Sequence, residues 1–308
     1  MKAVRMHIRA GPEALVYEDA PVPKPNQGDA LIRVQAAGIT PTELTWNSTF
    51  RTKEKVDRLP IIPGFEVAGR VERAPAGSGL TRGDPVYGLL DFWRNGSAAE
   101  YVAARASDIA PAPSTLDFVH AAAVPLSGLT AWQGLFDHGK VSQGDRVLVH
   151  GAGGGVGTYA LQLARWKGAH VIATCSPTKA NLVRELGADE VIDYTRARFD
   201  EEVSGLDAVL DTVGGETLER SWGVLRQGGA LVTIVDDAPE AKATEYGVRA
   251  VSMLVEPSRP QLIEIARLVD QGAVRPVVKQ VFPLSDARTA YEKGLAGHGT
   301  GKTVLKVA

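Results

Sequence analysis

The sequence predicts an α/β protein in which a doubly wound parallel sheet is joined to a second, β-rich domain. From Arg146 to about residue 271, short apolar segments of strand type alternate with helical patterns, which is typical of parallel strands joined by crossover helices. Outside this region, short candidate strands are separated by many glycine and proline residues, as in barrel-like domains. The length of 308 residues also suggests two domains.

The β-rich domain is expected to come from both ends of the chain. Residues 1–117 and the tail, residues 274–308, both have strand and turn character. We therefore assign them to one domain, and residues 118–273 to the other. The candidate strands of the β-rich domain cover residues 2–6, 30–36, 65–72, 85–90, 98–103 and 302–307.

The middle of the chain supplies the elements of the parallel sheet. Helical patterning opens this domain, and the expected helices cover about residues 117–138, 158–167, 178–186, 216–225 and 260–271. The six candidate strands cover residues 146–149, 171–175, 190–194, 207–213, 230–235 and 248–255. The last of these would form an edge of the sheet, and a long apolar edge strand invites pairing with a second copy of the chain.

A glycine-rich loop follows the first of these strands. Five of the seven residues from Gly151 to Gly157 are glycine, and a helical pattern comes next. This context fits a dinucleotide fingerprint, in which glycines let the backbone approach a pyrophosphate at a helix N-terminus; the alternative is a turn without a ligand. Against G-x-G-x-x-G, alanine replaces the first glycine. The loop residues expected to bind a cofactor are Ala152, Gly153, Gly154, Gly155, Val156 and Gly157.

Composition limits which binding partners, cellular compartment and cysteine or metal sites we expect for the protein. The net charge of −2 gives no reason to expect a nucleic acid or a membrane as partner. The N-terminus has no apolar signal core, so we expect a cytoplasmic protein. Cys175 is the only cysteine, which excludes an internal disulfide and a thiolate zinc cluster. The six histidines are scattered without metal-ligand spacing on a helix, at His7, His120, His138, His150, His170 and His298.

An extended pattern of residues surrounds the glycine loop, and further matches to the same family lie elsewhere along the chain. It comprises Gly144, Asp145, Leu148, Ala152–Gly155, Gly157, Gln162 and Arg165, with further matches in Met1–Val4, Ala36–Ile39, Gly128–Ala131 and Gly301–Leu305. In these residues the chain resembles the zinc-free quinone oxidoreductase, or ζ-crystallin-like, branch of the medium-chain dehydrogenase/reductase superfamily. The resemblance implies a Rossmann domain and a GroES-like catalytic domain built from the N-terminal part and the tail. It also implies a homodimer through the strand at residues 248–255.

The end of the second strand in the Rossmann domain indicates which nicotinamide cofactor is bound. NAD-binding domains usually place Asp or Glu there to bind the ribose 2′-hydroxyl, but residues 174–179 contain no carboxylate. The hydroxyl of Ser176 and the charge of Lys179 suit a 2′-phosphate, which favours NADPH; the alternative is a helix cap followed by a solvated lysine. The resemblance adds Tyr194 at the end of the third strand. The remaining residues expected to bind the cofactor are Val213, Ile234 and Lys302.

The resemblance also bears on catalytic zinc. Zinc-dependent relatives hold the metal with a Cys, a His-Glu pair and a later Cys or Asp. The matching positions are Thr40, Phe65 and Glu66. Threonine and phenylalanine do not fit such a site, and one glutamate cannot build a three-ligand site. We therefore expect an enzyme that works without zinc.

Without a metal, the expected reaction is hydride transfer from NADPH to an electrophilic carbon, in a quinone or an α,β-unsaturated carbonyl compound. The substrate oxygen gains negative charge, and the candidate donors that would stabilise it are the ribose 2′-hydroxyl of the cofactor, backbone N–H groups, and Thr40 or Thr130. Tyr87 and Tyr101 are candidate proton donors; the alternative is a buried tyrosine that only satisfies its own hydroxyl, in which case solvent supplies the proton. Aromatic residues in segments that border the substrate cleft of relatives could stack on a quinone or enone, and the alternative is packing in the core. They are Trp46, Phe50 and Trp93.

Two other functions stay open on sequence alone. A ζ-crystallin-like protein can be a non-catalytic NADPH-binding protein. An enoyl-thioester reductase would use the same hydride chemistry, with a cleft for a long acyl carrier arm. The sequence does not separate quinone from enone substrates.

Overall fold

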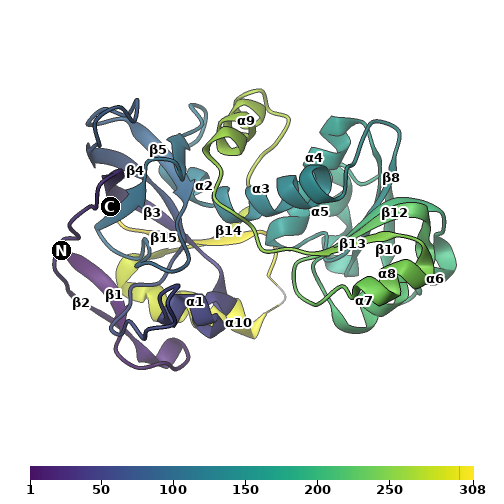
Figure 1. The fold of residues 1–308 in the computed structure, drawn as a ribbon, viewed down its shortest axis with the longest axis horizontal. Coiled ribbons are helices and arrows are strands. Elements are labelled where there is room, and N and C mark those ends of the chain that lie inside the picture. The colour runs from purple at the N-terminus through teal and green to yellow at the C-terminus, as the bar shows by residue number, and fades with distance from the viewer. Residues whose placement is uncertain (298) are drawn as a thin grey trace. The chain divides into compact units, whose positions relative to one another are not determined.

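The chain folds into two compact units (Figure 1), seen in a computed structural model that describes residues 1–297 and 299–308. His298, one of the scattered histidines, lies outside the described residues. The first unit comprises Met1–Leu126, Glu256–Gly272 and Pro276–Ala308. The second unit comprises Ser127–Val255 and Ala273–Arg275. The packing therefore places residues 118–126 and 256–272 with the β-rich unit, whereas the sequence analysis assigned them to the other domain.

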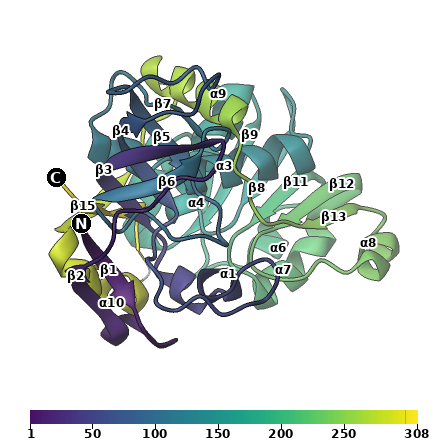
Figure 2. The same ribbon diagram turned by 60° about the vertical axis from the view of Figure 1, so that its left-hand side comes forward.

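The second unit contains the predicted doubly wound sheet. Its six strands are all parallel and run in the order β10-β9-β8-β11-β12-β13, and Figure 2 shows β8, β11, β12 and β13 side by side. The direction of strand order reverses between β8 and β11, which is where doubly wound folds bind their ligands. Their bounds are β8 (Arg146–Val149), β9 (His170–Cys175), β10 (Glu190–Asp193), β11 (Leu206–Asp211), β12 (Leu225–Thr233) and β13 (Arg249–Ser252).

Helices cover this sheet because each strand buries apolar side chains on both faces. Leu148, Val209 and Leu231 pack in one core cluster with Phe199 and Trp222. On the other face a π-helical segment, Gln133–His138, comes close to β11. The sequence analysis missed α6 and α8. The helices are α3 (Pro125–Trp132), which spans the junction of the two units, α4 (Gly155–Lys167), α5 (Ala180–Glu185), α6 (Phe199–Glu202), α7 (Gly215–Ser221) and α8 (Glu240–Tyr246).

The first unit is the predicted β-rich domain, and its main sheet joins the two ends of the chain. The sheet runs in the order β14-β15-β3-β4-β5-β7, and β6 also pairs with β3. Two further strands, β1 (Lys2–Met6) and β2 (Leu15–Asp19), pair with each other. The strands of the main sheet are β3 (Asp29–Ile39), β4 (Glu66–Arg73), β5 (Pro85–Leu89), β6 (Tyr101–Arg105), β7 (Ile109–Pro111), β14 (Val278–Pro283) and β15 (Lys302–Lys306).

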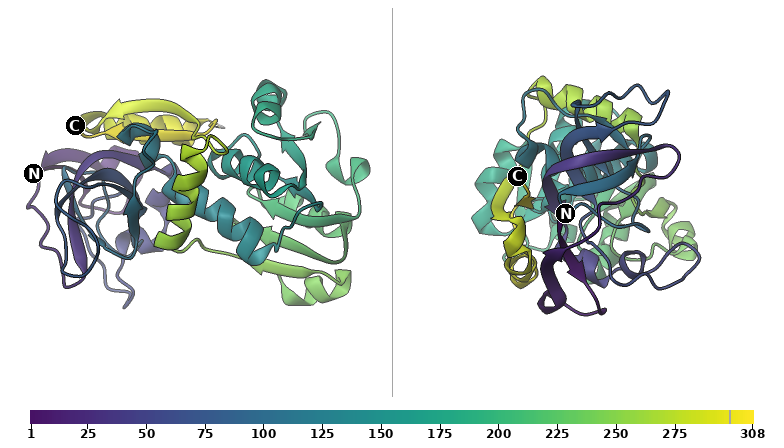
Figure 3. Two further views of the ribbon diagram at one scale, coloured as in Figure 1. Left: turned by 90° about the horizontal axis from the view of Figure 1, so that it is seen from above. Right: turned by 90° about the vertical axis from the view of Figure 1, so that its left-hand side faces the viewer.

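Four α-helices among the described residues complete the first unit: α1 (Asn47–Phe50), α2 (Phe118–Ala122), α9 (Arg259–Asp270) and α10 (Ala287–Ala296). The last corrects the expectation of only strands and turns in the tail. Ala287, Ala290 and Tyr291 are buried on one side of α10 and join the core. Figure 3 shows both termini at the same end of this unit. Among the described residues, no helix is long and apolar enough to cross a membrane.

Candidate functional site

The glycine loop joins β8 to α4, and its tight backbone requires glycine at particular positions. Gly151 has φ +66°, a conformation that favours glycine. A Cβ at Gly157 would lie 2.5 Å from the Gly151 carbonyl oxygen, so only glycine fits there. Gly154 caps α4 without a side-chain hydrogen bond, and the first N–H groups of a helix have no partner within the helix. This shape and the positive end of the helix dipole fit a pyrophosphate.

Lys179 lies over this loop. A Cβ at Gly153 would lie 2.5 Å from Lys179 Cδ, so the lysine stem packs on the glycine. Ser176 and Thr178 lie at the end of β9, and their hydroxyl oxygens are 3.1 Å apart. The end of β9 thus offers one cation and two hydroxyl groups, a combination suited to a phosphate monoester.

Three other predicted cofactor residues follow strand ends at the same edge of the sheet. Asp193 pairs with Cys175, so Tyr194 and Ser176 leave neighbouring strands together. Tyr194 and Val213 are exposed. Val213 follows β11, and Ile234 follows β12. The structure therefore brings Tyr194, Val213 and Ile234 to the edge that carries the glycine loop.

A buried carboxylate that the sequence analysis missed holds the loop after β11. Asp211 is fully buried and accepts hydrogen bonds from the N–H groups of Val213 and Gly214, each at 3.1 Å. The Thr233 hydroxyl donates to its second oxygen. Burial raises the pKa of Asp211, and the two backbone bonds oppose that rise. The bonds fix the backbone on which Val213 is presented.

His150 directly precedes the glycine loop. Its side chain is fully buried, so it is a structural group and not a catalytic one. Its ring nitrogens lie 2.9 Å from Thr174 Oγ1 and 3.1 Å from Ser221 Oγ. Burial lowers the pKa of His150 to about 3, so the ring is neutral at physiological pH. It ties β8 to β9 and α7.

A second group of polar residues lies in the first unit, where the strand β3 ends. The ammonium of Lys302 donates to Glu66 Oε2 at 2.5 Å and to Thr40 Oγ1 at 3.3 Å. Glu66 and Lys302 are buried, whereas Thr40 is half-buried. Lys302 was predicted to bind the cofactor, but the structure pairs its ammonium with a buried carboxylate. Sheet topology brings the two groups together, since the strands that begin with Glu66 and Lys302 both flank β3.

Glu43 and Tyr291 adjoin this group, and the sequence analysis assigned neither a role. Glu43 lies in a 3₁₀ turn, Pro41–Thr45, and the hydroxyl of Tyr291 on α10 donates to its carboxyl group. Both side chains are almost wholly buried. Burial raises the pKa of Glu43 to about 8, although Tyr291 and Lys302 oppose the rise. In the sequence, Glu43 falls in residues 38–44, which resemble the nicotinamide-side loop of the family, at a position where aspartate is commoner.

The positions that match zinc ligands in relatives do not fit zinc in this chain. Thr40 and Phe65 offer no suitable ligand, and Glu66 already binds the ammonium of Lys302. Among residues 1–297 and 299–308, no group of three or more His, Cys, Asp or Glu side chains could hold a metal ion.

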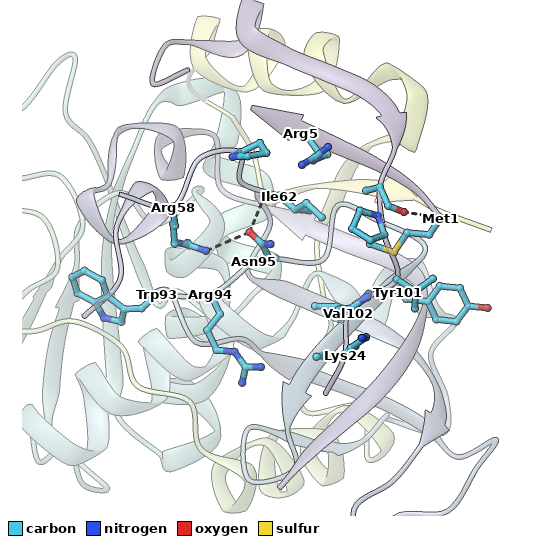
Figure 4. Close-up of a pocket in the computed structure, with 17 residues that line it drawn as sticks. Met1, Arg5, Lys24, Arg58, Ile62, Trp93, Arg94, Asn95, Tyr101 and Val102 are labelled. Atoms are coloured by element: carbon cyan, nitrogen blue, oxygen red, sulfur yellow. Dashed lines mark hydrogen bonds between the residues drawn. The ribbon is translucent and has the colours of Figure 1, made fainter. Parts of the chain in front are cut away.

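The three aromatic residues predicted near the substrate have different environments. Phe50 is only 2% exposed and belongs to the core of the first unit, so it cannot contact a substrate there. This corrects the prediction; a short helix turns the ring inward. Trp46 is half-buried and stacks on Phe65, with ring centroids 6.1 Å apart. Trp93 lines a cavity of about 560 Å³ in the first unit (Figure 4).

The remaining candidates divide into buried and accessible side chains. Thr130 lies on α3 and is buried. Tyr87 is fully buried and donates to the carbonyl of Leu262 at 2.5 Å. Burial raises the pKa of Tyr87 well beyond its usual range, so of the two interpretations of this residue the structure supports a buried tyrosine with a satisfied hydroxyl. Tyr101 lines the same cavity as Trp93.

Comparisons with known proteins agree with this geometry. Residues 26–114 match the family of alcohol dehydrogenase GroES-like domains, and residues 186–305 match the family of zinc-binding dehydrogenases. A probable zinc-binding oxidoreductase, mitochondrial, of Arthroderma benhamiae is 35% identical over 95% of this chain and 93% of its own length. The quinone oxidoreductase of Mus musculus is 31% identical over 99% of this chain and 97% of its own length.

Solved structures give the same result over the whole chain. The quinone oxidoreductase from Coxiella burnetii superposes with a TM-score of 0.92 at 32% identity, covering 100% of this chain and 99% of the other. Mycobacterial Rv1454c, solved in complex with NADPH, has a TM-score of 0.87 at 29% identity and covers 100% of both chains. The chain therefore belongs to the quinone oxidoreductase branch of the medium-chain dehydrogenase/reductase superfamily, whose members are NAD(P)H-dependent oxidoreductases.

Proposed function

We propose that this protein is an NADPH-dependent reductase that transfers hydride to quinones or α,β-unsaturated carbonyl compounds without zinc. The observation that carries the proposal is Lys179 lying over the glycine loop, beside two hydroxyl groups and no carboxylate at the end of β9. A relative of similar fold was solved with NADPH. NADPH supplies the hydride when it is bound.

The residues of the second unit bind and orient the cofactor in this proposal. The backbone from Ala152 to Gly157 holds the pyrophosphate at the N-terminus of α4. Ser176, Lys179 and Tyr194 bind the 2′-phosphate, and Val213 and Ile234 line the strand ends beyond it. A lysine next to a phosphate forms a charge-assisted bond that the 2′-hydroxyl of NADH cannot replace.

The reaction places its new charge on the substrate oxygen. As a hydride bonds to the β-carbon, the π electrons shift to the carbonyl oxygen, and a proton from water completes the reduction. Thr40 is proposed to donate a hydrogen bond to that oxygen. Zinc is not needed because a quinone or enone is already electrophilic, and the donor set around Thr40 does not fit the metal.

A panel of substrates and cofactors tests the proposal. We expect steady oxidation of NADPH with 1,2-quinones or enones, at a kcat/KM well above that with NADH. Dialysis against a chelator should leave the rate unchanged, whereas a loss restored by zinc would contradict zinc independence. Tight NADPH binding without turnover on quinones, enones or enoyl thioesters would instead favour a non-catalytic protein. Faster turnover with NADH would overturn the assignment of the 2′-phosphate site.

We also propose that the protein is a cytoplasmic homodimer. The strand predicted at residues 248–255 includes β13, which lies at the edge of the six-stranded sheet, and Leu254 just beyond it is 69% exposed. An unpaired apolar edge favours pairing with a second copy. Light scattering should give twice the chain mass of 32.7 kDa. A mass equal to one chain would contradict the dimer.

A further inference from the structure

The topology of the first unit brings a lysine, a glutamate and a threonine together. Thr40 directly follows β3, Glu66 begins β4, and Lys302 begins β15. Both strands run antiparallel to β3, and Gly38 pairs with Glu66 on one side and Val304 on the other. Antiparallel pairing thus places the first residues of both strands beside the last residues of β3.

Glu66 is held in one position. Its Oε1 accepts a hydrogen bond from the Leu126 N–H at 3.0 Å, and its Oε2 accepts one from Lys302 at 2.5 Å. A Cβ at Gly38 would lie 2.9 Å from Oε2, so the absence of a side chain there makes room for the carboxylate. The exposed fractions of Glu66 and Lys302 are 1% and 5%. The ammonium is therefore fixed and shielded from water.

The second bond of Lys302 determines the direction of the Thr40 hydroxyl. An ammonium group only donates, so Thr40 Oγ1 accepts at 3.3 Å and its own proton must point elsewhere. A cation bonded to the oxygen also strengthens the hydroxyl as a donor, because linked hydrogen bonds polarise one another. Replacing a buried ion pair by apolar residues is often neutral or stabilising for a protein. Stability alone therefore does not explain why this pair is present.

We propose that Lys302 is a positioning residue for the reaction: anchored by Glu66, its ammonium orients and polarises the Thr40 hydroxyl as the donor to the substrate oxygen. The inference rests on the proposed function, in which Thr40 stabilises that oxygen. It replaces the expectation that Lys302 binds the cofactor.

A double-mutant cycle on kcat tests this coupling. Thr40→Val and Lys302→Met should each lower kcat by about 100-fold, the usual loss when one donor to a developing oxyanion is removed. The Thr40→Val/Lys302→Met variant should be no worse than either single variant, because both remove the same donor. Thr40→Ser and Lys302→Arg should retain most of the activity. The Kd for NADPH, measured by fluorescence, should stay within about twofold of that of the parent protein.

Further variants test whether a loss of kcat comes from disturbed folding and not from the loss of the Lys302–Thr40 contact. Lys302→Met leaves the charge of Glu66 buried alone, so the cycle is repeated with Glu66→Gln/Lys302→Met, which removes both charges. Tyr291→Phe deletes a hydroxyl of the neighbouring buried pair and should leave kcat unchanged.

Three results would overturn the proposal, and a fourth separates it from the proposed function. Independent, multiplied losses in the double variant would show that Lys302 does not act through Thr40. A raised Kd for NADPH in Lys302→Met, with kcat intact, would show that Lys302 binds the cofactor. Full activity of Thr40→Val would remove the role of Thr40 while the proposed function stands. Failure of the unmutated protein to turn over any substrate in the panel would refute the proposed function itself.

Discussion

The glycine loop of the second unit and the Glu66–Lys302 pair of the first unit differ in how their functional groups are brought together. The loop is made by consecutive residues, and the groups it offers to a ligand are backbone N–H groups at the start of α4. The pair is made by side chains 236 residues apart, which meet because their strands flank β3. The glycine loop should therefore be disrupted by a Cβ added where the backbone is tightly packed, as at Gly157. The Glu66–Lys302 pair should instead be disrupted by the loss of one of its two charges.

Gly157→Ala tests the backbone side of this comparison and should have the largest effect. The new Cβ would meet the Gly151 carbonyl oxygen at 2.5 Å and the Cα of Ala152 at 2.6 Å, and neither atom belongs to a flexible side chain. We expect the Kd for NADPH to rise by about 100-fold, which corresponds to ~3 kcal/mol. Fluorescence titration measures it. Gly223→Ala, where a Cβ meets nothing within 4 Å, is the control, and equal Kd values for both variants would contradict the argument.

Lys179→Met tests whether the lysine charge adds to the NADPH affinity that the loop backbone provides. Methionine keeps an unbranched stem over Gly153 but removes the charge. The Kd for NADPH should rise by about 10-fold, as expected for loss of one charge-assisted hydrogen bond, while the Kd for NADH stays unchanged. Lys167→Met, at the exposed end of α4, is the matched control. Equal weakening of both cofactors would mean that Lys179 acts only by packing on the loop.

Glu43→Gln tests the energetic cost of burying carboxyl groups beside the Glu66–Lys302 pair. Burial raises the pKa of Glu43 from 4.5 to about 8, so between these pH values the unfolded chain releases a proton that the folded protein keeps. The free energy of unfolding should therefore fall as pH rises across this window, by up to about 1.4 kcal/mol per pH unit from this group. Lys302, Tyr291 and Glu66 face the same carboxyl group and set its final value.

The change to glutamine should flatten that dependence. Urea unfolding at a series of pH values measures it, with Glu245→Gln on the exposed surface of α8 as the control. A slope that is unchanged in Glu43→Gln would refute the assignment of a raised pKa to this residue.

Phe50→Leu should give the smallest effect and separates the core from the substrate site. The ring belongs to the core of the first unit, so a smaller side chain should lower the free energy of unfolding by about 1 kcal/mol. The KM for quinones and enones should stay the same. A change in KM without a change in stability would restore Phe50 as a substrate contact.

The same contrast explains how much could be predicted from the sequence. The six strands of the second unit follow from apolar runs and were predicted within a few residues, apart from the early start of β12 at Leu225. The glycine loop could also be predicted, because its residues are adjacent and their conformations are local. A doubly wound sheet with residues 248–255 at its edge was also predicted, and the observed strand order places β13 at that edge.

What the sequence could not show depends on pairing between distant segments. Nothing near Lys302 in the chain indicates that its partner is Glu66, since only the position of β15 beside β3 brings them together. Helix α10 was missed because most of its apolar residues are alanines, and its buried side follows from contacts with the rest of the first unit. Phe50 was misplaced for a similar reason, since an aromatic residue in a loop segment can face either the core or the solvent.

The division of the chain also sets an order of events during synthesis. Almost all of the second unit is continuous, from Ser127 to Val255, whereas the first unit needs residues from both ends of the chain. Chains emerge from the ribosome N-terminus first and domains generally fold as units, so the cofactor-binding sheet can form while the first unit still lacks β15. The ammonium that contacts Thr40 arrives only with the last seven residues. A nascent chain would thus acquire cofactor binding before it acquires the assembled Thr40 site.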